Sequence, residues 1–382
     1  MRFPLKRRPV PPAAAQAVQT APAPGLFWEG QGLMGLEHQC QLYDRLRQSV
    51  PIIDAALCKI VRLTMGEISL TLSDKKAEKE LSRFLRQVPV AGGGEGITEF
   101  LSRYLDSLLC YGNAAGEVIF DHKRGEITGL YNAALSDIEV RPGDSPMERR
   151  IFSRHGGFDL RPVPYPQLVL FTPLSPKPGQ VVGRSLLASL PFVSSVLLKI
   201  YEATRQNFER VGNVRFAVTY RPGEGAMDRA YAQEMAENIA AQWRNALSQS
   251  DGKVRDFVCV GDVDIKVIGA DNQILDIQVP ARQMAEQIVA KLGIPPFLLG
   301  LQWSTTERMS AQQADILTSE LDSYRMLLNG VIRRIAGIWL LSRGIREEPE
   351  ITWEEINLQD QVEAARARLY DAQAKNLTGR AR

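Results

Sequence analysis

The sequence predicts an α+β protein in which a region of short strands is followed by a series of long helices. Between residues 35 and 175, short apolar runs alternate with Gly, Pro and Asp turns, a pattern typical of an antiparallel sheet. From residue 185 onward, apolar residues recur at steps of three and four, which is the spacing of amphipathic helices. A chain of 382 residues is also long enough for two or three domains with their own cores.

The first region is expected to begin with helices and to continue as a mostly antiparallel sheet. Pro51 and Gly66 bound one amphipathic stretch, since Pro favours the first turn of a helix and Gly its end. Further helices are expected at residues 74–88 and 97–111, the latter with a single apolar face. Strands are expected at residues 67–72, 117–121, 126–133, 137–142, 150–154 and 168–173.

The second region is expected to contain two long helices with a compact insert between them. The first helix spans residues 185–211, and the second spans 276–293 and is closed by Pro295 and Pro296, because proline removes a backbone donor and stops a helix. The insert combines a strand at 214–220 with a helix and a hairpin.

The most regular feature is a further helix of some 30 residues after this pair. Ser310, with Gln313 three residues later, predicts a capping box at its start. A helix of roughly 45 Å with one narrow apolar stripe is expected to pack along another helix or a neighbouring subunit. The stripe consists of Ala314, Leu317, Leu321, Tyr324, Leu328, Val331, Ile335 and Ile338.

Composition excludes several classes of function. The 46 basic and 44 acidic residues leave a net charge of +2, which argues against a dedicated reader of duplex DNA. The four cysteines and three histidines are scattered without the close, repeated spacing of a zinc site. The stretch at 91–96 lacks the Lys-Ser/Thr ending of a phosphate-binding P-loop, and no Ser elbow of a hydrolase occurs. We therefore expect no cofactor, no metal and no enzymatic activity.

The N-terminal residues 1–25 are rich in Pro and Ala and are expected to form a disordered arm. They begin with basic residues but never build the apolar core of a signal peptide. The longest uncharged run, residues 185–198, is shorter than the roughly 20 apolar residues that span a bilayer, so no membrane segment is expected.

Three motifs in a fixed order resemble the portal proteins of tailed bacteriophages and gene-transfer agents. They are "YGNAAGEVIFD" with "ITGLYNA" and "DIEVRP", then "GRSLLASL", and then "IVAKLGIPPFLLGLQWSTTERMSAQQADIL". Members of that family carry a comparable Tyr-Gly-Asn turn, a Gly-x-Ser-Leu segment and a Pro-Pro-x-Leu-Gly segment before a Ser/Thr-rich loop. The resemblance covers residues 40 to 345, whereas the short C-terminal part argues against a large crown or barrel.

The resemblance implies a portal-like division of the chain. In the family's terms the parts are a disordered arm (1–25), an α+β wing (26–183), a stem helix (184–212), a clip (213–273), a second stem helix (274–300), a tunnel loop (301–309), a long wing helix (310–344) and a short crown or tail (345–382).

The resemblance also implies a tunnel loop that faces DNA at the ring axis. Its side chains are those of Gln302, Trp303, Ser304, Thr305, Thr306, Glu307 and Arg308. Pro295 and Pro296 would break the preceding helix, the run "FLLG" would anchor the break in the apolar interior, and Gly300 would let the chain turn. Hydroxyls with one carboxylate and one guanidinium suit weak, sequence-blind contact with a sliding duplex.

The implied function is a ring, usually of twelve subunits, at one capsid vertex. It would be the channel for packaging and ejection of double-stranded DNA, in the virion and, during assembly, in the host cytoplasm. The implied partners are the terminase large subunit, the major capsid or scaffold protein and a head–tail connector or adaptor protein, without a membrane.

Two other classes of function remain open at this point. One is a metal-dependent nucleic-acid-processing enzyme that uses carboxylates such as Asp106, Glu117, Asp121 and Asp137, although carboxylates at strand ends are usually turn formers. The other is a helical adaptor or scaffold that binds a partner through the stripe between residues 314 and 338.

Overall fold

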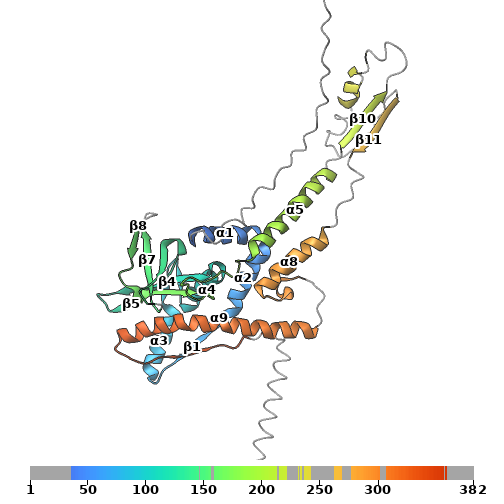
Figure 1. The fold of residues 1–382 in the computed structure, drawn as a ribbon. Coiled ribbons are helices and arrows are strands. Elements are labelled where there is room, and N and C mark those ends of the chain that lie inside the picture. Colours follow the sequence, from blue (N-terminus) through green and yellow to red (C-terminus); the bar gives the residue numbers. More distant parts are fainter. Residues whose placement is uncertain are drawn as a thin grey trace, which may run out of the picture. The chain divides into compact units, whose positions relative to one another are not determined.

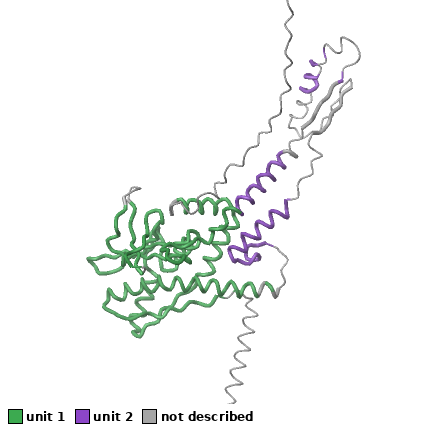
Figure 2. The backbone as a smooth tube through the Cα atoms, viewed as in Figure 1, with its two compact units in different colours: residues 1–192, 302–382 green, residues 193–301 purple. Residues whose placement is uncertain are grey.

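The computed structural model describes residues 36–145, 147–155, 159–212, 215–221, 262–268, 277–301 and 307–356, with Leu358 and a few residues between 231 and 241. The chain divides into two compact units, which Figure 2 shows in different colours. Unit 1 combines residues 1–192 with residues 302–382, and unit 2 consists of residues 193–301. Unit 1 is therefore built from two segments that are distant in the sequence.

Unit 1 contains helices and short strands in the order that Figure 1 shows. Its helices are α1 (Leu36–Ser49), α2 (Pro51–Thr64), α3 (Lys75–Gln87), α4 (Ile97–Tyr111) and α9 (Glu307–Ser342), with the 3-10 turns η1 (Leu135–Asp137) and η2 (Pro166–Leu168). Its strands are β1 (Ile68–Thr71), β2 (Pro89–Val90), β3 (Gly94–Glu95), β4 (Asn113–Asp121), β5 (Glu126–Ala133), β6 (Ile138–Pro142), β7 (Arg149–His155), β8 (Asp159–Pro162), β9 (Val169–Pro173) and β12 (Glu350–Trp353). The α+β prediction is confirmed.

The helices of unit 1 begin where local chemistry favours it. Pro51 occupies the first turn of α2, where its missing N–H costs no hydrogen bond. Asp74 precedes α3 and its side chain accepts a hydrogen bond from the Lys76 backbone N–H at 2.8 Å, which satisfies an otherwise free donor. In α4 the expected apolar face is buried, and this helix forms the centre of the core.

Two sheets dominate unit 1. The larger has the strand order β3-β2-β5-β4-β9, and all its pairs are antiparallel except β2 with β5. The smaller, β6-β7-β8, is also antiparallel. Helix α4 covers one face of the larger sheet: a Cβ on Gly116 would lie 2.8 Å from the Phe100 ring, and Asn132 donates to the Phe100 carbonyl at 3.1 Å.

On the other face of the larger sheet, a second cluster joins the two sheets. It contains Ala115, Leu135, Ile138, Val140 and Phe171. The cluster covers the part of this face near Ala115, and the outer part of the same face stays exposed at Ile119 and Tyr131.

Helix α9 crosses unit 1 and buries the stripe that its periodicity predicts. Seven of the eight positions are buried, and only Ile338 is partly exposed. Its inward-facing Arg325 donates to the carbonyls of Thr64 (2.9 Å) and Glu354 (2.7 Å) and lies over the Trp353 ring. The stripe therefore packs against the chain's own unit, so the adaptor hypothesis, in which it binds a partner, is wrong.

The predicted start of this helix is also wrong. Helix α9 begins at Glu307 and has 36 residues, so Ser310 lies inside the helix and cannot cap it. Glu307, Arg308 and Met309 are favourable helix formers, and a carboxylate in the first turn suits the helix dipole. These propensities extend the helix into a stretch that was expected to be loop.

Unit 2 contains helices and a two-stranded sheet. Its elements are α5 (Leu190–Gly212, of which residues from Val193 belong to this unit), β10 (Arg215–Arg221), β11 (Asp262–Ile268), α8 (Gln278–Leu292) and the 3-10 turn η3 (Pro296–Leu299). Strands β10 and β11 pair antiparallel over seven positions, from Arg215 with Ile268 to Arg221 with Asp262. Most of the predicted insert, the N-terminal arm 1–25 and the charged C-terminal segment after Leu358 lie outside the described residues.

Among the described residues, no helix is both long enough and apolar enough to cross a bilayer.

Candidate functional site

The break before the candidate loop follows from local backbone chemistry. Helix α8 ends at Leu292, and Gly293 caps it in the left-handed conformation with φ +67°. Pro295 and Pro296 then lead into η3, whose end is Gly300 with φ +73°. The Gly300 N–H donates to the Phe297 carbonyl and the Leu301 N–H to the Pro296 carbonyl, each at 3.1 Å. The helix therefore ends before the two prolines, at the Gly293 cap, and the chain turns again at Gly300.

The anchoring of this break differs from the prediction. Ile294 is 2% exposed, whereas Phe297 in the run "FLLG" is 41% exposed and Leu298 and Leu299 are only partly buried. The 3-10 turn directs successive side chains to three sides of its axis, so the run cannot bury all its side chains in one direction. Ile294 is therefore the anchor.

The candidate loop itself is only partly described. Gln302, Trp303, Ser304, Thr305 and Thr306 lie outside the described residues. Glu307 and Arg308, which were expected in the loop, form the first turn of α9 instead. The candidate loop is thus shorter than predicted. Only residues 302–306 remain in it, and their role stays a prediction.

A site that the sequence reasoning missed brings two of the three portal-like motifs together. Gly112 and Asn113 lie between α4 and β4, and Gly183 to Ser185 lie about 70 residues later, directly before α5. We call Gly112, Asn113, Leu174, Gly183 and Ser185 the glycine junction. Its only signal in the sequence is that both motifs carry a glycine next to a polar residue.

Hydrogen bonds hold the glycine junction together. The Gly183 N–H donates to Asn113 Oδ1 at 2.8 Å, and Ser185 Oγ–H donates to the Cys110 carbonyl at 2.6 Å. The Leu187 N–H donates back to Ser185 Oγ at 2.9 Å. Backbone bonds from Leu174 to Gly112 and from Arg184 to Leu174, both 2.8 Å, complete the network. These bonds join the end of α4 to residues 183–187 at several points, so they fix the position of this segment.

Both glycines of the junction are required by space. Gly112 has φ +76°, and a Cβ there would overlap the backbone of Arg184 and Ser185. A Cβ on Gly183 would overlap the Gly112 carbonyl and the Leu174 backbone. Only a residue without a side chain allows the two strands of chain to approach so closely.

The junction also corrects the predicted start of the first long helix. Helix α5 begins at Leu190, not near residue 185, because residues 183–187 hydrogen-bond to the end of α4 instead. Pro191 in its first turn agrees with this later start.

The carboxylates of the enzyme hypothesis are engaged separately. Asp106 accepts from Arg47 Nη1 at 2.7 Å, Asp121 accepts from the Lys123 backbone N–H at 2.8 Å, and Asp137 accepts from Ser136 Oγ at 3.0 Å. Among the residues that the structure describes, no group of three or more His, Cys, Asp or Glu is placed to hold a metal ion. Asp106 is thus in an ion pair with Arg47, and Asp121 closes the turn after β4.

Two ionisable side chains near α4, those of Arg47 and Cys110, have raised pKa values. Burial disfavours the charged form of Arg47, but the hydrogen bonds that Arg47 donates to Asp106 and Asp54 outweigh it and raise the pKa of this guanidinium. Burial raises the pKa of the Cys110 thiol to about 12, so this thiol is protonated at neutral pH and is a poor nucleophile.

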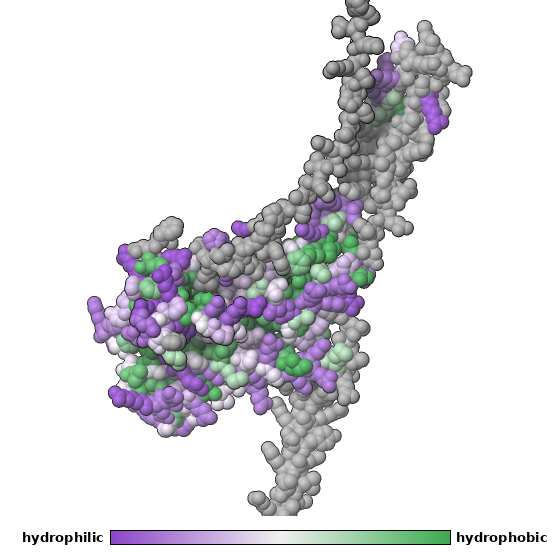
Figure 3. All heavy atoms as spheres, in the orientation of Figure 1, coloured by the Kyte–Doolittle hydropathy of each residue, from purple (hydrophilic) through white to green (hydrophobic). Residues whose placement is uncertain are grey.

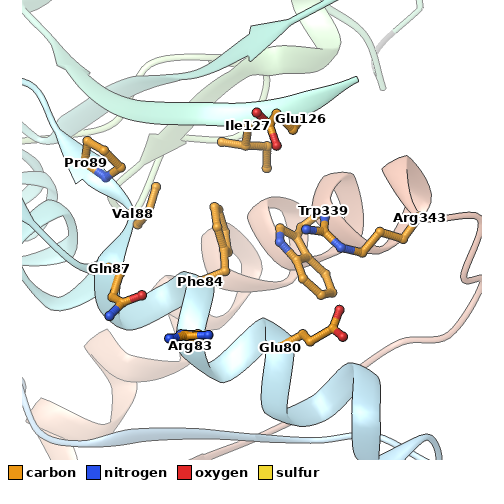
Figure 4. A pocket seen from close by; sticks show the side chains of 10 residues that line it. All are labelled: Glu80, Arg83, Phe84, Gln87, Val88, Pro89, Glu126, Ile127, Trp339 and Arg343. Carbon is orange, nitrogen blue, oxygen red and sulfur yellow. The ribbon is translucent and has the colours of Figure 1, made fainter. Parts of the chain in front are cut away.

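A cavity of about 340 Å³ lies between α3, the start of β5 and the end of α9. In Figure 4 the rings of Phe84 and Trp339 and the side chain of Ile127 surround it, and charged side chains stand at its rim. The Arg343 guanidinium lies 3.7 Å from the centre of the Trp339 ring, and the Phe84 and Trp339 centroids are 5.9 Å apart. Half of the ten lining residues are polar or charged, and two of them, Glu80 and Glu126, are carboxylates.

The family model of the phage portal protein matches residues 58–376, which is most of the chain and includes both units. Among curated protein sequences, none matches the chain significantly.

Solved structures from gene transfer agent particles share the fold. A chain from the virion of a native gene transfer agent particle matches with a TM-score of 0.62 and 16% identity over 87% of this chain and 89% of that one. A chain from the neck of an empty particle, computed with C6 symmetry, gives 0.61 and 16% over 86% and 88%. A chain from the neck of a native particle, computed with C12 symmetry, gives 0.58 and 16% over 85% and 89%.

At 16% identity, these solved structures show only that the fold is shared. The family model, in contrast, spans the motifs of the glycine junction and of the proline break. The resemblance seen in the sequence is therefore confirmed. The chain belongs to the phage portal protein family.

Proposed function

We propose that this portal protein assembles into a ring of twelve copies at one vertex of a capsid and that the ring is the channel for double-stranded DNA. The observation that carries the proposal is the match of the family model through residues 58–376. The particle necks with C6 and C12 symmetry that share the fold support a cyclic assembly. The portal protein family is structural rather than enzymatic, so no catalytic activity is part of the proposal.

Within this proposal, residues 302–306 form the loop that faces the DNA. The support is local: η3 and Gly300 turn the chain sharply after α8, and α9 begins seven residues after Gly300. The stretch offers an indole, hydroxyls and an amide but no charge. A lining without a ring of cations releases few counterions on contact, so the duplex can slide rather than be held.

The proposal also includes three kinds of partner protein. The terminase large subunit would dock during packaging, a connector protein would replace it, and the capsid or scaffold protein would surround unit 1. The protein would then act in the virion, after assembly in the host cytoplasm.

The first test is the particle mass of the full-length protein with negative-stain images of the same sample. Twelve copies of the 42.5 kDa chain weigh about 510 kDa and should appear as rings with a central hole. A uniform species of one or two copies at every salt and protein concentration would overturn the ring.

The channel loop needs its own test, since a ring could form without it. Replacing Trp303 by Ala and deleting Ser304 to Thr306 should leave the ring mass unchanged and reduce DNA packaged or retained per particle. Lys123→Gln, in the exposed turn between β4 and β5 of unit 1, is a control that should leave both unchanged. Loss of ring mass in the loop variant would contradict a loop that lies free at the axis.

A further inference from the structure

Helix α3 carries a row of cations on the side opposite to its buried residues. Ala77, Leu81 and Leu85 are buried in the core of unit 1. At 3.6 residues per turn, residues at steps of three, four and three lie along one side of a helix. On the outer side of α3 such a series consists of four exposed cations, Lys76, Lys79, Arg83 and Arg86. We call these four residues the basic row.

The surface around the basic row is hydrophilic. In the space-filling view, hydrophilic residues cover the lower left edge of unit 1, where α3 lies (Figure 3). No large apolar side chain of α3 is exposed. The centre of a protein–protein interface is apolar and poor in lysine, so this surface fits a polyanion better than it fits a folded protein partner.

Most of the charge of the basic row is not neutralised within the described part of the chain. Arg86 lies 3.6 Å from Glu67, and both side chains are at least 70% exposed, where an ion pair is weak. The side chains of Lys76, Lys79 and Arg83 form no ion pair with another described residue. Three of the four cations are therefore available to a ligand.

Helix α3 itself contributes two carboxylates, and only one of them borders the basic row. Glu78 accepts hydrogen bonds from the Leu72 backbone N–H and from Lys75 Nζ, each at 2.9 Å. Glu80 is exposed and lies beside Arg83 on the outer side of the helix. Four cations against one carboxylate leave the outer side of α3 positively charged.

The two ends of the chain do not complement this charge. Residues 1–35 and 359–382 lie outside the described residues, and each stretch contains more Lys and Arg than Asp and Glu. Like charges repel, so neither end is suited to cover the basic row.

We propose that the basic row binds the phosphate backbone of duplex DNA, at a site separate from the channel loop. The inference rests on the proposed function, which brings duplex DNA to the protein. Duplex DNA carries one negative charge for about every 1.7 Å of its axis, so a row of roughly 15 Å can contact several phosphates at once. Contacts to phosphates alone do not depend on base sequence.

A ring would strengthen this contact by repetition. Symmetry places the basic row of every copy at the same distance from the ring axis, so the rows form a circle of identical sites. A duplex that contacts two neighbouring rows binds more tightly than one that contacts a single row, because the second contact is intramolecular. The uncharged stretch 302–306 would let DNA slide, whereas the basic rows would hold it.

The experiment measures binding of a relaxed, covalently closed circular duplex to rings of the full-length protein. A closed circle cannot be threaded through a ring, so the channel does not contribute to the affinity. The test variant combines Lys76→Gln, Lys79→Gln and Arg83→Gln, since glutamine is a favourable helix former. We expect an affinity lower by at least about tenfold at low salt. The slope of log K against log salt should shrink by about two to three, because each phosphate contact contributes about 0.9.

A matched control removes the same number of cations elsewhere on unit 1. It combines Arg45→Gln on α1, Arg62→Gln on α2 and Lys123→Gln in the turn between β4 and β5, all at exposed positions, and it should bind the circle as the wild type does. Glu80→Gln removes the carboxylate beside the basic row and should raise the affinity by about threefold, the scale of one exposed charge interaction. Mass photometry and thermal unfolding establish that each variant forms rings and is folded.

Several outcomes would overturn the inference. Wild-type rings that do not bind the circle, an α3 variant that binds like the wild type, or a control that loses as much affinity would each exclude the basic row as the DNA contact. An α3 variant that binds DNA normally but is not incorporated into capsids would show that the row binds an acidic protein instead. A wild-type protein that never forms rings would reject the proposed function, whereas DNA binding by its single chains that is lost in the α3 variant would still support the basic row.

Discussion

The glycine junction and the proline break are both sharp turns of the chain, yet they are held in different ways. At the junction, residues about 70 positions apart are hydrogen-bonded together, and Gly112 faces the backbone of Arg184 and Ser185 directly. At the break, a Cβ on Gly300 would meet no atom of the described residues within 4 Å, and the hydrogen bonds span only three to five residues. Glycine serves close approach in the first turn and backbone conformation in the second.

This difference predicts that replacing glycine by alanine lowers the free energy of unfolding much more at Gly112 than at Gly300. Gly112→Ala should destabilise the chain by about 4 kcal/mol or more, since the methyl group overlaps backbone that cannot move aside. Gly125→Ala, at φ +70° with no atom near its α-carbon, is the matched control and should cost only about 1–2 kcal/mol of backbone strain. Denaturant unfolding of the full chain measures both. Equal costs at the two positions would mean that overlap plays no part at the junction.

The next largest loss of stability is expected from removing the Ser185 hydroxyl at the glycine junction. Ser185→Ala removes the donor to the Cys110 carbonyl and the acceptor for the Leu187 N–H at a site that is 5% exposed. Two buried backbone groups then lose a partner, at a cost of about 2 kcal/mol. The same unfolding measurement checks it, with Ser102→Ala on the exposed side of α4 as control. A neutral result would show that water replaces the hydroxyl.

The smallest effect is expected at the break. Gly300→Ala should cost about 1 kcal/mol, because alanine in the left-handed region is strained but its methyl group would meet none of the described residues. Gly337→Ala inside α9 should have the opposite sign and stabilise by about 0.5–1 kcal/mol, since alanine is the better helix former. Thermal unfolding at a fixed protein concentration compares them. A loss at Gly300 as large as that at Gly112 would mean that the break is packed as tightly as the junction.

Much of the secondary structure could be predicted because it depends on short-range patterns. The strands at 117–121, 126–133 and 168–173 and the helix at 97–111 occur where alternation and helical spacing place them. The start of α9 could not be placed correctly, because the capping signal at Ser310 and Gln313 competes with favourable helix formers before it. Helix α5 begins later than predicted for another reason. Ser185 donates a hydrogen bond to a carbonyl 75 residues away, which no local pattern reveals.

The candidate site likewise combines features that local residue types predict with features that depend on distant contacts. The helix break at Pro295 and Pro296 and the turn at Gly300 follow from residue type, so they were predictable. Which hydrophobic residue anchors the break was not, since burial of Ile294 rather than Phe297 depends on what surrounds the turn.

By itself, the sequence determined the α+β composition, the buried stripe of α9, the proline break and the membership in the portal family, because each depends on residue types at short, regular spacing. The tertiary structure alone decided that the two glycine motifs lie against each other and that the long helix buries its stripe in its own unit. These features depend on contacts between residues that are far apart in the chain, and such contacts leave no periodicity in the sequence.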